Sequence, residues 1–193
     1  MKFPARCLRL LPMLCIFCLL LCGCQGSAEP GEMHLQTLAG KSFEALCETR
    51  LTAGGVVSEY TLSLCYTAAG SEVVIRSPEA HAGITVRVGN GAELVWEDVQ
   101  LVIPGGEEHI SLFSLLHSLS GSLTGGDAGA YMRERMNGED VITALCSAKV
   151  GENELSHRIS LAAKSGFPTE SHSSADDGTT LYCRWREFTV QEG

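Results

Sequence analysis

The chain has 193 residues, with 14 lysines and arginines against 23 aspartates and glutamates. That length suits one domain with a core large enough to need no disulfide or metal for stability. The balance of 45% hydrophobic and 19% charged residues is globular, and a net charge of -9 excludes a nucleic-acid binder, which needs a basic surface. Nine cysteines are unusual, and their meaning depends on where they lie.

Residues 1–23 have the pattern of a secretory signal peptide. Lys2, Arg6 and Arg9 form a basic start, and an uncharged apolar run follows them up to Cys22. The run is shorter than the roughly 20 residues that a transmembrane helix needs, so an uncleaved anchor helix is the less favoured alternative. Without this segment the chain keeps 11 basic and 23 acidic residues, a net charge of −12.

The end of this segment, Leu21-Cys22-Gly23-Cys24, resembles the bacterial lipobox, in which an aliphatic and a small residue precede a lipidated cysteine. Cys24 would become the first residue and carry a thioether-linked diacylglycerol. Two acyl chains give stable attachment to a bilayer, which the acidic domain surface alone would not. We therefore expect residues 24–41 to be a lipidated cysteine and a tether on the extracytoplasmic face of a cell membrane.

From Ser42 onward, apolar and polar residues alternate with a period of two, which predicts half-buried strands. Glycine-containing turns such as Gly54-Gly55 separate them. The predicted strands cover 43–51, 60–67, 72–76, 84–88, 92–103, 141–150, 155–164 and 179–190.

The period changes to that of an amphipathic helix over residues 107–123. Ile110, Phe113, Leu116 and Leu119 recur every three residues, and two glutamates at the start favour the helix dipole. A weaker helix is expected over 128–136. Together these elements predict one α+β domain over 42–193, a curved antiparallel sheet (an open half-barrel) with one or two helices on its concave face.

Four of the cysteines lie in the predicted leader, and Cys47, Cys65, Cys146 and Cys183 lie in the domain. In the hairpin of the first two strands, the pairing that puts both apolar sets on one face sends Cys47 and Cys65 to opposite faces. A disulfide between these two is therefore disfavoured. Buried free thiols are expected, and at least one disulfide is the alternative.

No catalytic or metal-binding pattern stands out. The six histidines form no zinc motif and are expected at the surface or rim, and the carboxylates occupy turns and polar strand faces. Gly40-Lys41-Ser42 imitates the end of a P-loop, but Leu35 stands where its first glycine is needed. The chain is therefore predicted to be no enzyme and to need no metal or cofactor.

An apolar sheet face combined with a wide apolar helix forms either an ordinary core or the lining of a groove for an acyl chain or a partner peptide. The residues expected to line such a groove are Leu62, Leu64, Trp96, Ile110, Phe113 and Leu116.

Three stretches resemble the lipoprotein-carrier fold of LolA and LolB. They are Ile75-Arg76-Ser77-Pro78, then Gly83-Ile84 and Leu94-Val95-Trp96 around a glycine turn, and Gly166-Phe167-Pro168 before a final strand that reaches Phe188. With the lipobox, the pattern is most similar to the Gram-positive germination-specific lipoproteins (GerS-like) of spore-forming Clostridia.

The resemblance implies a half-barrel without enzymatic activity. Carriers of this fold hold acyl chains, whereas the germination lipoproteins are linked to a peptidoglycan amidase that modifies spore cortex. The segment before Ser42 is too short for the long N-terminal helix of carriers, and a tethered protein is a poor shuttle. The resemblance thus favours an anchored lipoprotein that binds an envelope protein such as an amidase. Binding of a lipid or another apolar ligand in the cavity is the alternative, and an envelope hydrolase is a third.

Overall fold

The computed structural model describes residues 30–89, 91–104, 110–126 and 128–191. The predicted leader, Cys24 and the two glutamates before the helix lie outside this part. The helices are α2 (Pro30–Leu38) and α3 (Leu112–Thr124), with a 3-10 turn η2 (Glu79–His81). The strands are β1 (Ser42–Ala53), β2 (Val56–Thr67), β3 (Gly70–Ser77), β4 (Thr85–Val88), β5 (Ala92–Trp96), β6 (Val99–Ile103), β7 (Ala130–Met136), β8 (Glu139–Val150), β9 (Asn153–Ala162), β10 (Pro168–Ala175) and β11 (Thr180–Gln191).

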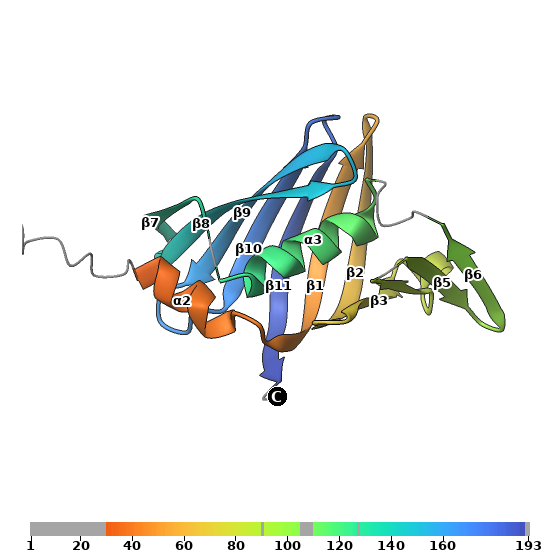
Figure 1. Ribbon diagram of the computed structural model, residues 1–193, viewed down its shortest axis with the longest axis horizontal. Helices are drawn as coiled ribbons and strands as arrows, with labels where there is room; N and C mark the ends of the chain where they lie inside the picture. Colours follow the sequence, from red (N-terminus) through yellow and green to blue (C-terminus); the bar gives the residue numbers. More distant parts are fainter. Residues whose placement is uncertain (1–29, 90, 105–109, 127, 192–193) are drawn as a thin grey trace, which may run out of the picture.

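The eleven strands form a single sheet in the order β6-β5-β4-β3-β2-β1-β11-β10-β9-β8-β7, with antiparallel neighbours throughout. The last strand, β11, pairs with the first, β1, and so joins the two halves of the chain. The sheet curves around α3 without closing into a barrel, and α2 lies on the same side (Figure 1). This confirms the predicted α+β fold.

The core lies between the concave face of the sheet and α3. Alternate residues of β1, including Phe43, Ala45 and Cys47, point into it, as the period of two requires. The apolar stripe of α3 covers them, and its Leu115, Leu116, Leu119 and Leu123 side chains are fully buried.

The helix begins later than predicted. The Ser111 side chain accepts a hydrogen bond from the backbone N–H of Ser114 (3.1 Å), and the Ser114 hydroxyl accepts one from the backbone N–H of Ser111 (2.9 Å). This capping box satisfies the backbone N–H groups of Ser111 and Ser114 and makes Ser111 the N-cap. Ile110 therefore precedes the helix, and its prediction as a helical residue was wrong.

The second predicted helix, over 128–136, is also wrong, because this segment contains strand β7. Asn137 and Gly138 both have positive φ (51° and 85°), which suits a two-residue hairpin turn. The turn pairs β7 with β8, so tertiary pairing overrides the weak helical pattern of an Arg- and Glu-rich segment.

The predicted single strand over 92–103 is a hairpin of β5 and β6. Glu97, with φ of 52°, and Asp98 form its turn. The sequence pattern also missed helix α2, which lies in the segment expected as a tether and buries Leu35 and Leu38 in the core.

Strand β10 was not predicted either, since its inward side chains include serines rather than apolar residues. Ser171 and Ser173 are buried. The Trp185 indole N–H donates to the Ser171 hydroxyl (2.8 Å), and the Ser173 hydroxyl lies 2.8 Å from His157 Nδ1. These hydrogen bonds, to Trp185 on β11 and His157 on β9, offset the cost of burying the two hydroxyl groups.

Candidate functional site

The six residues predicted to line a groove do not come together in one place. Leu62 and Leu64 on β2 and Leu116 on α3 are fully buried in the core, where they contact other side chains. Phe113 and Ile110 are partly buried against the same core. Trp96 lies elsewhere, at the end of β5, and is 48% exposed.

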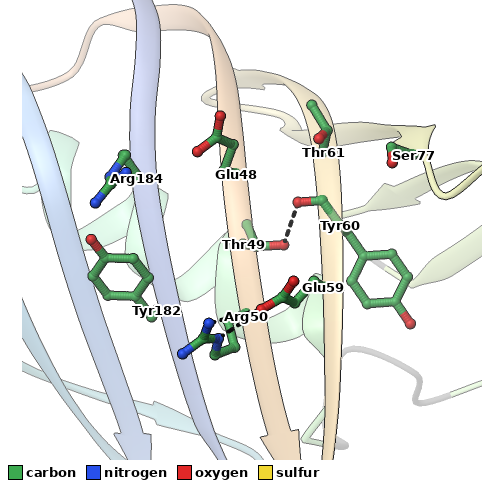
Figure 2. A pocket seen from close by; sticks show the side chains of 9 residues that line it. All are labelled: Glu48, Thr49, Arg50, Glu59, Tyr60, Thr61, Ser77, Tyr182 and Arg184. Atoms are coloured by element: carbon green, nitrogen blue, oxygen red, sulfur yellow. Dashed lines mark hydrogen bonds and ion pairs between the residues drawn. The ribbon is translucent and has the colours of Figure 1, made fainter.

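A hollow of about 470 Å³ lies across β1, β2 and β11, and Figure 2 shows its lining. Its floor is mainly polar, with charged residues from all three strands between Tyr60 and Tyr182. Arg50 pairs with Glu59 (2.8 Å), and Glu48 pairs with Arg186 (2.7 Å). Because these charges already have partners and are well exposed, the hollow has the character of a solvated sheet face.

A buried polar chain connects α3 to the sheet. The Ser118 hydroxyl lies 3.0 Å from His157 Nε2, and the Ser173 hydroxyl lies 2.8 Å from His157 Nδ1. His157 is only 1% exposed, which corrects the prediction that the histidines lie at the surface or rim. Burial lowers the pKa of His157 from 6.5 to about 4.

The order serine, histidine, serine imitates a nucleophile, a base and an orienting group, but its chemistry is weak. A hydroxyl in the third position supplies no negative charge to stabilise an imidazolium, which a carboxylate would do. The lowered pKa also makes the His157 imidazole a poor proton acceptor near neutral pH. The chain of hydrogen bonds is therefore best explained as satisfied core polarity.

Cys47 and Cys183 are buried free thiols, as expected from the sequence, whereas the Cys65 thiol is only partly buried. Cys47 pairs with Leu62 and Cys65 pairs with Glu44, so the two thiols belong to opposite faces of the hairpin, as predicted. Burial raises the pKa of the Cys47 thiol to about 12 and that of Cys183 well above its ordinary value. These two thiols are therefore suited to packing rather than to nucleophilic chemistry.

An exposed apolar surface lies on the hairpin of β5 and β6. Its register places Ala92, Leu94 and Trp96 opposite Ile103, Leu101 and Val99, so one face of the hairpin carries apolar side chains throughout. On this face, Trp96, Val99 and Leu101 are 48%, 62% and 55% exposed, whereas Val102 lies on the other face, opposite Glu93. We call Trp96, Val99, Leu101 and Ile103 the apolar hairpin patch.

The apolar face of this hairpin continues the core face of the sheet. Leu94 pairs with Val86 and Ala92 pairs with Val88, and both valines are buried. Figure 1 shows that β5 and β6 lie beyond the region that α3 covers. The patch is thus the part of the core face that the chain leaves open in its described residues. The sequence contained one signal for it, the acidic Glu97-Asp98 pair that interrupts an apolar run.

The described residues hold no group of three or more histidine, cysteine, aspartate or glutamate side chains placed to bind a metal ion. No helix among them is long and apolar enough to cross a membrane.

Comparison with solved structures finds similar chains at low sequence identity. Similar chains include a domain of an outer membrane lipoprotein-sorting protein of Vibrio parahaemolyticus (10% identity, 84% of this chain and 92% of that chain, TM-score 0.47). A LolA superfamily protein of Nitrosomonas europaea (11%, 84% and 93%, 0.42) and the lipoprotein LppX of Mycobacterium tuberculosis (10%, 85% and 96%, 0.44) are also similar. No family model and no curated protein sequence matches the chain.

Proposed function

We propose that this protein is a non-catalytic lipoprotein, anchored to the extracytoplasmic face of a cell membrane through Cys24, which binds another envelope protein through the apolar hairpin patch. The observation that carries the proposal is the patch itself. It gathers four large apolar side chains on an acidic protein, at a place where no helix of the described structure covers the sheet. Exposed apolar patches of this kind mark protein or ligand contacts.

The position of the patch favours a protein partner over the anchoring membrane. Cys24 precedes α2 in the sequence, and α2 and the β5–β6 hairpin lie toward opposite ends of the long axis of the molecule (Figure 1). A partner held in the same envelope compartment can reach the far end. The proposed partner is a peptidoglycan amidase that acts in spore cortex modification or germination, which is the partner that the GerS-like resemblance implies.

The alternative, binding of a lipid or another apolar ligand in the half-barrel, is less well supported. Leu62, Leu64 and Leu116 were expected to line that cavity, and they are packed against other core residues. A ligand there would have to displace α3, whose four inward leucines are fully buried.

The proposed function predicts site-specific cross-linking in cells. Benzoylphenylalanine at position 101, in place of Leu101, should give a covalent adduct with an envelope protein, because that side chain is 55% exposed within the patch. The same photoprobe in place of Met132, which is 40% exposed on β7 at the opposite end of the sheet, serves as the matched control.

Mass spectrometry of the adducts identifies the partner, which we expect to be an amidase. Equal adducts at both positions, or none at position 101, would contradict the proposal that the patch binds a partner. An adduct with another envelope protein would retain the binding function and exclude the amidase.

A further inference from the structure

We infer that the partner binds by strand addition: an extended apolar segment with basic residues at its carboxyl end pairs with β6 and adds a twelfth strand to the sheet. This inference rests on the proposed function and specifies the chemistry of the partner. It follows from the free backbone edge of β6, from its uncharged side chains, and from the acidic residues that precede it in the sequence.

The backbone of β6 is available for pairing. β6 lies at one end of the sheet and pairs with β5 on one side, and no other described strand pairs with it. Alternate N–H and C=O groups along its outer side can therefore accept a further strand. Pro104 follows Ile103 and cannot donate a ladder hydrogen bond, so the segment open to pairing spans about five residues.

The two edges of the sheet differ in how they are protected. β7, at the other end, carries Arg133, Glu134 and Arg135 in succession, and such charges discourage pairing with another chain. β6 has the sequence Val-Gln-Leu-Val-Ile, without a charge or a proline. A further strand can therefore pair with β6, whereas the charges of β7 disfavour such pairing.

A second copy of this chain fits β6 poorly because of charge. Glu97 and Asp98 precede the strand, and Glu107 and Glu108 follow Pro104 closely in the sequence. Parallel pairing of two copies would place Glu97 and Asp98 beside their own counterparts, and antiparallel pairing would offer them no basic residue, because β6 itself carries none. A segment that ends in lysine or arginine beside Glu97 and Asp98 has the complementary charge.

A bilayer fits poorly as well. Unpaired backbone groups on β6 would lie in hydrocarbon, where they find no hydrogen-bond partner. The acidic turn of the hairpin would also be repelled by anionic headgroups. An extended peptide satisfies the backbone groups and covers the exposed valine and leucine side chains at the same time.

The test uses the full chain in detergent and the fluorescent peptide Val-Thr-Val-Ile-Val-Lys-Lys, whose binding is followed by anisotropy. We expect saturable binding, and hydrogen exchange should slow at the amides of β6 and not at those of β7. Leu101→Lys should weaken binding at least about tenfold, since it removes an apolar contact at the centre of the strand. Met132→Lys, on the other edge, should leave binding unchanged.

Two altered peptides separate strand pairing from other contacts. Methylation of alternate backbone nitrogens should abolish binding because it removes ladder donors, and replacement of both lysines by glutamate should weaken it. Equal binding of the methylated peptide would overturn strand addition, and equal binding of the acidic peptide would overturn the charge assignment. β6 protection that depends on protein concentration would instead identify a second copy, and protection by phosphatidylglycerol vesicles would identify a membrane contact.

The outcome is independent of the cross-linking experiment. If position 101 gives an adduct in cells but no peptide protects β6, the proposed function stands and strand addition fails. If neither occurs, both fail.

Discussion

At the scale of single residues, the structure uses polar and reactive groups as core components. His157 links α3 to two strands through serine hydroxyls, and Cys47 and Cys183 are buried thiols with raised pKa values. From sequence alone, histidine and cysteine are readily assigned to catalysis. Their burial without a charged partner in the hydrogen-bonded chain assigns these examples to packing instead.

The buried histidine predicts a pH-dependent stability. With a pKa of about 4 in the folded state against 6.5 ordinarily, His157 binds fewer protons folded than unfolded between these values. Stability is therefore complete above about pH 6.5 and falls as the pH decreases to about 4, by roughly 3 kcal/mol. Urea unfolding at several pH values across this window measures the loss.

The control for this prediction is His157→Gln, which removes the titrating group. Its free energy of unfolding should change less with pH over the same window than that of the wild type. Burial also lowers the pKa of His117, so His117→Gln should remove a smaller part of the dependence. An unchanged slope in His157→Gln would show that other groups cause it.

At the scale of elements, α3 is the piece that closes the core over the middle of the sheet. Its capping box determines where it begins, and the helix contacts strands from both halves of the chain, including β3, β4, β8 and β9. The helical period in the sequence predicted this element but placed its start too early. The weak helical pattern over 128–136 gave a wrong prediction of a helix. Strand β7 forms there because of its turn and its pairing with β8.

The role of α3 predicts a large loss of stability for Leu119→Ala. Leu119 is fully buried among core side chains, so truncation should cost about 3 kcal/mol of the free energy of unfolding, through lost apolar burial and the cavity left behind. Ser122→Ala, at a partly exposed position of the same helix, should change stability by less than about 0.5 kcal/mol. Chemical denaturation of both variants checks the contrast, and similar losses would mean that α3 is not a core helix.

At the scale of the whole molecule, α2, which follows the proposed anchor in the sequence, and the apolar hairpin patch lie toward opposite ends. The chain after residue 23 has a net charge of −12, which gives it no attraction to an anionic membrane surface. Attachment therefore depends on Cys24 in our proposal. The eleven-stranded sheet separates the α2 end of the molecule from the hairpin.

The anchor predicts that Cys24→Ser moves the protein from the membrane fraction to the soluble fraction, because the lipid chains are the proposed source of attachment. Cys22→Ser should leave it in the membrane, since that residue lies in the part that is removed. Fractionation followed by immunoblotting reads out both variants. Retention of Cys24→Ser in the membrane would refute the lipobox assignment.

The features that depend on local period and composition could be predicted from the sequence alone. Alternation in β1 and β2 predicted which residues share a face, and so placed Cys47 and Cys65 on opposite sides, because the side-chain period of a strand is a local property. The α+β class followed from strands around one helical segment. The overall acidity is likewise visible in composition alone.

The presence of strand β10 and the burial of particular apolar residues depend on tertiary packing and could not be predicted from local sequence. Strand β10 exists because its buried serines find Trp185 and His157 on neighbouring strands, partners that no local pattern announces. Leu62 and Leu101 are both leucines on apolar strand faces, yet one is fully buried and the other is 55% exposed. The difference is whether α3 lies over the strand, and that depends on where a distant segment packs rather than on the residue itself.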